Sequence, residues 1–174
     1  MSSRPVSILN PDDLIAQAAK LIRPPPKGPP LRVDLRRAIP AAYYGVFHAT
    51  LIAVADTLVG RAHRVSPHYA LAYRSVDHRG FKTFCEAVRR SPLPPKYQPY
   101  EPEGGFNADI QGFASAAAAL QDARHEADYD PRGRFRTSDA ALAVNAARAA
   151  LDHWNAAPAE QRTAFVMLLV LPPR

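Results

Sequence analysis

The stretch that most constrains this chain runs from residue 31 to residue 59, LRVDLRRAIPAAYYGVFHATLIAVADTLV. It is the longest segment without a cluster of helix-breaking residues. At 100° per residue, one broad and mainly apolar face collects seven positions, which are Arg36, Pro40, Tyr43, Phe47, Leu51, Val54 and Leu58. The pattern predicts one central helix. Proline inside a helix removes a hydrogen bond, so we expect either a kink at Pro40 or a helix that starts near Ile39.

The same stretch carries a second, polar line of side chains. Arg37, Tyr44 and His48 are separated by seven and four residues, and both steps return almost to the same side of a helix. A cation, a phenol and an imidazole therefore share one face beside the apolar one. An amphipathic core helix does not need them.

The rest of the chain also indicates helices. Capping residues, prolines and apolar spacing predict segments at 11–22, 66–90 with an interruption at 78–80, 107–130, 137–156 and 158–171. Residues 23–30 and 91–107 are rich in proline and read as a linker and a long loop. No segment alternates as a strand does. We predict an all-α, antiparallel bundle of about five to six helices. It forms a single domain over 1–174, with an N-terminal helix and linker at 1–30, a core at 31–157 and a C-terminal helix at 158–174.

Composition narrows the classes of function. The net charge is +6 and the pI about 9.8, which favours a phosphate-bearing partner such as RNA or a nucleotide. An arginine-rich composition from a GC-rich genome would give the same charge. The single Cys85 excludes an internal disulfide. No uninterrupted apolar run reaches the ~18 residues of a membrane span, and no secretion signal is evident. We expect a cytoplasmic protein that does not enter a membrane.

The apolar stripe of segment 107–130 ends in charge. Steps of three and four residues lead from Leu120 to Arg124 and then to Asp128. A buried guanidinium needs partners, and Asp128 or the Arg37–Tyr44–His48 line could provide them. Such a cluster would either fix helix register or form a phosphate site, with arginine on the phosphate and an imidazole moving a proton.

Three segments resemble one family. They are Arg36-Arg37-Ala38-x-x-Ala41-Ala42-Tyr43-Tyr44-x-x-Phe47-His48-Ala49, His78-Arg79-Gly80-x-x-x-x-Phe84 and Leu120-x-x-x-Arg124-x-x-Ala127-Asp128-Tyr129-Asp130-Pro131. They are similar, in order, to signature segments of bacterial and archaeal HEPN domains. The resemblance covers roughly residues 31–155. It implies a compact helical bundle that forms a homodimer and works beside a nucleotidyltransferase in toxin–antitoxin or defence systems.

The resemblance also implies a chemistry and shows a departure from it. Many HEPN domains are metal-independent RNases with the motif R-x(4–6)-H, whereas the fifth position after Arg124 is Tyr129 here. Arg61-x6-His68 fits the spacing but falls in a predicted loop, so we attribute it to chance. His48 could supply the missing imidazole. If the protein cleaves RNA, Arg124 would bind the phosphate and His48 would act as general acid and base.

Other candidates give weaker signals. His63, His68 and His78 lack acids or cysteines at ligand spacing, so we expect surface histidines and no metal. Cys85 falls on an apolar face and is expected to be an inert thiol. No cofactor motif is present.

Two hypotheses follow from the sequence. The first is a HEPN-like protein that binds RNA or nucleotide and, if it is catalytic, cleaves RNA. Arg37, Tyr44, Asp128 and Tyr129 would bind the ligand beside the two catalytic candidates, Arg124 and His48. The second is a non-catalytic helical interaction module that pairs with a nucleotidyltransferase or another protein.

Overall fold

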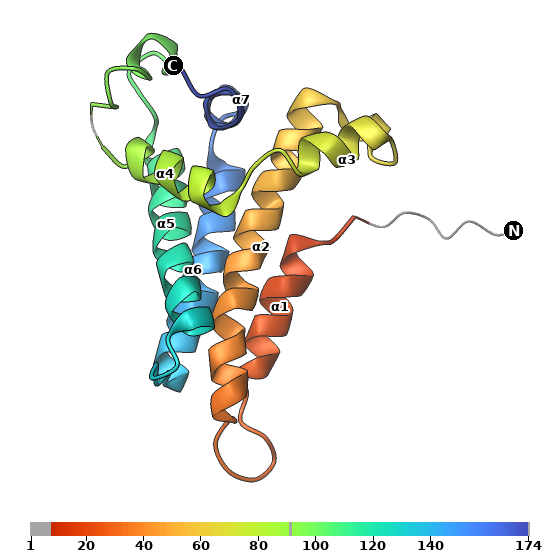
Figure 1. Cartoon of the computed structure of the whole chain (residues 1–174), viewed down its shortest axis with the longest axis vertical. Coiled ribbons are helices and arrows are strands. Elements are labelled where there is room, and N and C mark those ends of the chain that lie inside the picture. The colour runs from red at the N-terminus through yellow and green to blue at the C-terminus, as the bar shows by residue number, and fades with distance from the viewer. Residues whose placement is uncertain (1–7, 91, 174) are drawn as a thin grey trace, which may run out of the picture.

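The structure is a computed structural model that describes residues 8–90 and 92–173, and this part of the chain is all-helical (Figure 1). Its helices are α1 (Pro11–Leu21), α2 (Arg32–Leu58), α3 (Pro67–Tyr73), α4 (His78–Val88), α5 (Ala108–Tyr129), α6 (Thr137–Ala156) and α7 (Ala159–Val170), with short 3-10 turns at Arg61–His63 and Gln98–Tyr100. The predicted all-α bundle is confirmed.

The helices of the described chain fall into two groups, one side by side along the long axis and one at its upper end. Figure 1 shows α1, α2, α5 and α6 along the long axis, with α3, α4 and α7 at the upper end. Helix α2 packs against α1, α3, α5, α6 and α7. The prediction that this helix is central is confirmed. Because it touches most of the other elements, its side chains are the ones that meet residues from distant parts of the chain.

Helix α2 runs through Pro40 without interruption. The alternative start near Ile39 is therefore wrong, and the helix begins at Arg32. By mean hydropathy and length α2 could also cross a membrane, which a search for an uninterrupted apolar run does not reveal. Most of its apolar window is buried inside the bundle, as in the core helix of a folded domain.

Side-chain caps mark where α1, α4 and α5 begin. The side chain of Asn10 accepts a hydrogen bond from the backbone N–H of Asp12 at 3.1 Å, and Asn107 accepts one from Ile110 at 3.0 Å. The Asp77 carboxylate accepts the N–H of Gly80 at 2.8 Å, so α4 begins at His78. The predicted interruption is therefore present but lies at 74–77, between α3 and α4, and residues 78–80 are the first turn of a capped helix.

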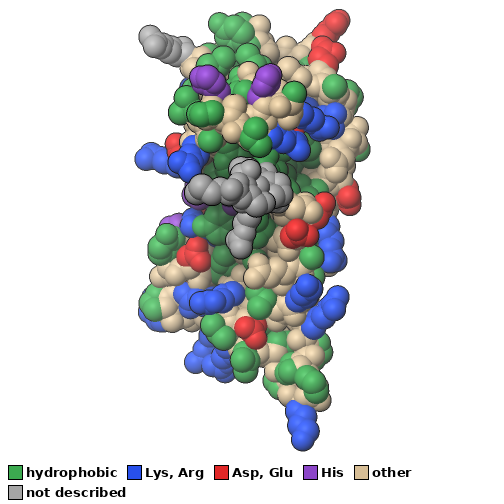
Figure 2. Space-filling view, turned by 90° about the vertical axis from the view of Figure 1, so that its right-hand side faces the viewer, with side chains coloured by type: hydrophobic (Ala, Val, Ile, Leu, Met, Phe, Trp, Pro, Cys, Tyr) green, Lys and Arg blue, Asp and Glu red, His purple; other side chains and the backbone are tan. Residues whose placement is uncertain are grey.

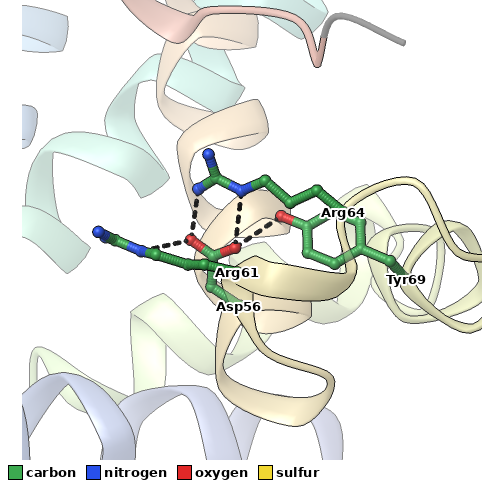
Figure 3. A network of polar contacts seen from close by, with 4 residues as sticks. All are labelled: Asp56, Arg61, Arg64 and Tyr69. Atoms are coloured by element: carbon green, nitrogen blue, oxygen red, sulfur yellow. Dashed lines mark hydrogen bonds and ion pairs between the residues drawn. The ribbon is translucent and has the colours of Figure 1, made fainter. Parts of the chain in front are cut away.

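The turn after α2 is fastened by one carboxylate. Figure 3 shows Asp56 of α2 accepting hydrogen bonds from Arg61, Arg64 and the hydroxyl of Tyr69. Burial alone would raise the pKa of Asp56, but the bonds from Arg64 and Tyr69 outweigh it and lower the pKa below its ordinary value. The carboxylate therefore stays charged and holds α3 against the end of α2. Tyr73, at the end of α3, is placed by this contact.

Candidate functional site

A groove opens between α1 and α2. It has a volume of about 490 Å³ and is lined by Leu14, Gln17, Leu21, Arg37, Ala41, Tyr44 and His48. The three polar side chains predicted to share a face of α2 therefore lie on one wall, and α1 supplies the opposite wall. A cation, a phenol and an imidazole face one solvent-accessible space.

His48 is held by a phenol from another helix. Its Nδ1 lies 2.5 Å from the hydroxyl oxygen of Tyr73, and the two rings stack with centroids 5.9 Å apart. Burial lowers the pKa of His48 below its ordinary value, so the ring is neutral at neutral pH. Burial also raises the pKa of Tyr73. The second nitrogen, Nε2, has no hydrogen-bond partner within residues 8–90 and 92–173, which leaves it free for a ligand in the groove.

Arg124 approaches the same line from α5. Its Nη2 donates a hydrogen bond to the hydroxyl of Tyr44 at 3.2 Å. Its Nε lies 2.8 Å from Asp128 Oδ2, an ion pair without the alignment of a good hydrogen bond. Burial works against the charge, but Tyr44 and Asp128 outweigh it and raise the pKa of Arg124. Both predicted partners of Arg124 are thus present. However, its side chain is only 14% exposed, and it does not line the groove.

His78 joins the cluster, which the sequence did not predict. Its Nδ1 lies 2.7 Å from the hydroxyl oxygen of Tyr43. That hydroxyl donates its proton to Gln121 Oε1 at 3.3 Å. Burial, followed by the positive charge of Arg124, lowers the pKa of His78. The expectation that His78 is a surface histidine is therefore wrong. Its match in the HEPN-like segment was the signal that could have identified it.

Tyr44 is the centre of this polar cluster. Its ring centroid lies 5.6 Å from the guanidinium carbon of Arg124, 5.8 Å from the ring of His78 and 6.1 Å from the ring of His48. Two neutral imidazoles and one fixed cation thus surround a phenol at the edge of the groove. This set can position a phosphate oxygen and accept a proton.

Tyr129, which was predicted to bind the ligand, and the Arg61–His68 pair, whose spacing was attributed to chance, lie outside the groove. Tyr129 is 64% exposed, and its ring lies 5.8 Å from the guanidinium carbon of Arg124. Arg61 forms an ion pair with Asp56, and His68 is exposed. The structure does not bring these residues to His48, so the spacing of Arg61 and His68 defines no site.

We predict that stability falls as the pH decreases from about 7 to about 5. Burial lowers the pKa of His48 and His78 from the ordinary 6.5, so the unfolded chain takes up protons first. The free energy of unfolding therefore decreases as the pH falls through 6.5, and this decrease ends below the folded-state pKa values. Urea denaturation at about pH 7.5 and pH 5.5 measures it.

The matched variants separate these two histidines from the others. His48→Gln and His78→Gln should each reduce the difference between the two pH values, whereas the exposed His68→Gln should leave it as in the wild type. An unchanged difference in both buried-site variants would contradict the prediction.

The three HEPN-like segments of the chain remain a resemblance of short motifs. Functional conclusions therefore depend on the groove and on the polar cluster behind it. No known protein family, no curated protein and no solved structure matches the chain.

Proposed function

We propose that this protein is a HEPN-like protein that binds RNA or a nucleotide in the groove between α1 and α2, and that it cleaves RNA there without a metal. The observation that carries the proposal is the line of Arg37, Tyr44 and His48 on one wall of the groove, with the His48 ring fixed through Nδ1 by Tyr73. A fixed imidazole with a free second nitrogen is the arrangement of a general base.

The positions of the two arginines support different roles for them in this proposal. Arg37 lines the groove and is exposed, so it takes the phosphate-binding role that the sequence suggested for Arg124. Arg124 contacts Tyr44 from behind and acts as a positioning residue for that hydroxyl. In this scheme the ligand contacts the exposed guanidinium of Arg37, and the buried ion pair between Arg124 and Asp128 stays intact.

The reaction needs no group beyond the chain and the RNA. Neutral His48 takes the proton of a ribose 2′-hydroxyl, and the 2′ oxygen forms a bond to phosphorus while the bond from phosphorus to the 5′ oxygen breaks. Protonated His48 then gives its proton to the departing 5′ oxygen, and a 2′,3′-cyclic phosphate remains. Arg37 stabilises the charge that develops on the phosphate oxygens.

The test is cleavage of a labelled RNA pool by purified protein in the presence of EDTA. His48→Ala should reduce the rate by about 100-fold or more, and Arg37→Gln by roughly tenfold or more. The control variants His68→Ala and Arg148→Gln change exposed residues outside the groove and should cleave as the wild type does. Circular dichroism checks that each variant is folded. Equal activity of His48→Ala and His68→Ala would refute the assignment.

The burial of Arg124 favours a second function. An ion pair with Asp128 and a side chain only 14% exposed also suit a cluster that fixes helix register. The protein would then be a non-catalytic module that pairs with a nucleotidyltransferase or another protein. No cleavage by the wild type, together with a lower Tm for Arg124→Ala, would support it.

The proposed function includes a homodimer, which light scattering would report as about twice 19.0 kDa.

A further inference from the structure

A second pocket lies at the end of the bundle where α2 begins. Its volume is about 510 Å³, and its lining residues are Arg32, Val33, Arg36, Gly133, Arg134, Phe135 and Arg136. Four of the seven are arginines, and no acidic residue lines it within the described chain. In Figure 2, which views the α1 side, blue Lys and Arg side chains are more frequent than red Asp and Glu ones over the lower half of the molecule, where this end lies. The pocket is therefore a concentrated positive site.

The arginines come from two elements that are fixed to each other. Arg36 Nη2 donates a hydrogen bond to the backbone carbonyl of Asp130 at 2.8 Å, and its guanidinium carbon lies 6.0 Å from the ring centroid of Phe135. The Phe135 ring packs so closely on Gly133 that a Cβ there would meet it at 3.0 Å. The loop between α5 and α6 is thus held against the first turns of α2. The two backbone segments that carry the four arginines are therefore held together before a ligand binds.

The carboxylates of Asp130 and Asp139, which lie near the pocket in the sequence, accept hydrogen bonds from the backbone. Asp130 Oδ1 accepts the N–H of Arg132 at 2.8 Å, and Asp139 Oδ2 accepts the N–H of Arg136 at 2.8 Å. These carboxylates order the loop and start α6. Among the described residues, none of the four pocket arginines forms an ion pair with a carboxylate.

The pocket lies beside two helix N-termini, whose positive field is partly offset by Asp34 in the first turn of α2 and Asp139 in the first turn of α6. Residues 32, 33 and 36 belong to the first turns of α2, and Arg136 immediately precedes α6. The residue before α2 is Leu31, whose side chain has no acceptor to cap the helix. The N–H groups of a helix start favour an anion. Four guanidiniums around two helix starts form a site for more than one negative charge.

We propose that this pocket binds a chain of adjacent phosphates, as carried by a nucleoside triphosphate. Guanidinium groups pair with phosphate oxygens through two parallel hydrogen bonds, and four of them match a polyphosphate better than a single carboxylate. The volume lies in the range of small-ligand pockets. The site is separate from the groove of His48 and does not depend on the function proposed for that groove.

Calorimetric titration of the full chain in about 0.15 M salt tests the proposal with four probes: inorganic triphosphate, ATP, adenosine and a single-stranded RNA oligonucleotide. Triphosphate and ATP should bind, and adenosine should not. The double variant R134Q/R136Q should weaken the binding of both phosphate ligands by at least about tenfold. This double variant keeps the hydrogen bond from the backbone N–H of residue 136 to Asp139 and the hydrogen bond from Arg36 to the carbonyl of Asp130. The charge-matched control R74Q/R148Q changes exposed arginines outside the pocket and should bind within about twofold of the wild type.

Three results would overturn the proposal: no binding of triphosphate or ATP by the wild type, an equal loss in the control double variant, or binding of the RNA oligonucleotide alone. The two sites are told apart by their own variants: Arg37→Gln and His48→Ala should leave intact the triphosphate binding that R134Q/R136Q weakens, and any binding lost in Arg37→Gln but kept in R134Q/R136Q belongs to the groove. An absence of RNA cleavage would therefore refute the function of the groove and not this site.

Discussion

Replacing Phe165 by alanine should lower the free energy of unfolding by about 3–5 kcal/mol. Phe165 of α7 is fully buried. Its ring centroid lies 4.9 Å from that of Phe84, 5.5 Å from Phe113 and 5.7 Å from Trp154. These partners come from α4, α5 and α6, so one side chain joins four helices at the upper end of the bundle. Its removal leaves a cavity that three separately anchored helices cannot close, which places the cost at the high end for core substitutions.

Thermal unfolding should show this loss as a Tm lower by roughly 6–20 °C, since each kcal/mol shifts Tm by about 2–4 °C in a chain of this size. Met167→Ala on the same helix is the matched control. Met167 is 38% exposed, so its truncation should shift Tm by only a few degrees. Equal shifts for the two variants would show that α7 is not part of the cooperative core.

Replacing Gly45 by alanine should destabilise the protein by about 1–3 kcal/mol, although alanine is the better helix former by about 1 kcal/mol. A Cβ at position 45 would lie 2.5 Å from Cγ1 of Ile15 and 3.2 Å from the backbone carbonyl of Pro11. Ile15 is buried and branched at Cβ, so its Cγ1 has little freedom to move. The methyl group would push α1 away from α2 and widen the groove that the two helices form.

Urea denaturation of three further variants isolates this contact. Gly80→Ala should be neutral or slightly stabilising, because a Cβ there meets Asp77 only at an ordinary 3.6 Å. In an Ile15→Ala background, Gly45→Ala should cost clearly less than in the wild type, since the obstructing atom is gone. Equal costs of Gly45→Ala in the two backgrounds would show that α1 does not pack as closely as described.

Local sequence patterns were sufficient for most of the fold. The central helix was predicted to within one residue at each end, because its apolar face is wide and ends at Gly60. Where the prediction was wrong, a local signal had been weighed incorrectly. Pro40 did not start the helix, since a proline costs one hydrogen bond and many packed side chains offset that loss. Asp77 was not recognised as a cap, so the first turn of α4 was taken for a break.

The site was only half predictable. Periodicity places residues on one helix relative to each other, which is why the Arg37–Tyr44–His48 line and the Arg124–Asp128 pair were found. It says little about which short helix crosses which long one. Tyr73 and His78 come from α3 and α4, whose positions depend on long-range packing and on the Asp56 contacts. The arginine-lined pocket was missed for the same reason, because its two halves are about a hundred residues apart.

The uninterrupted course of α2 limits how the length of related chains can vary. Arg36 lines the arginine pocket and Arg37 the groove, and the neighbouring residues differ in direction by about 100°. Inserting one residue between Arg37 and Tyr44 would turn both arginines by that angle and misalign each with its cavity. An insertion of seven residues would restore the directions but lengthen the helix by about 10 Å. Length variation is therefore expected in the loops at 22–31 and 92–107, and the register of α2 should stay fixed.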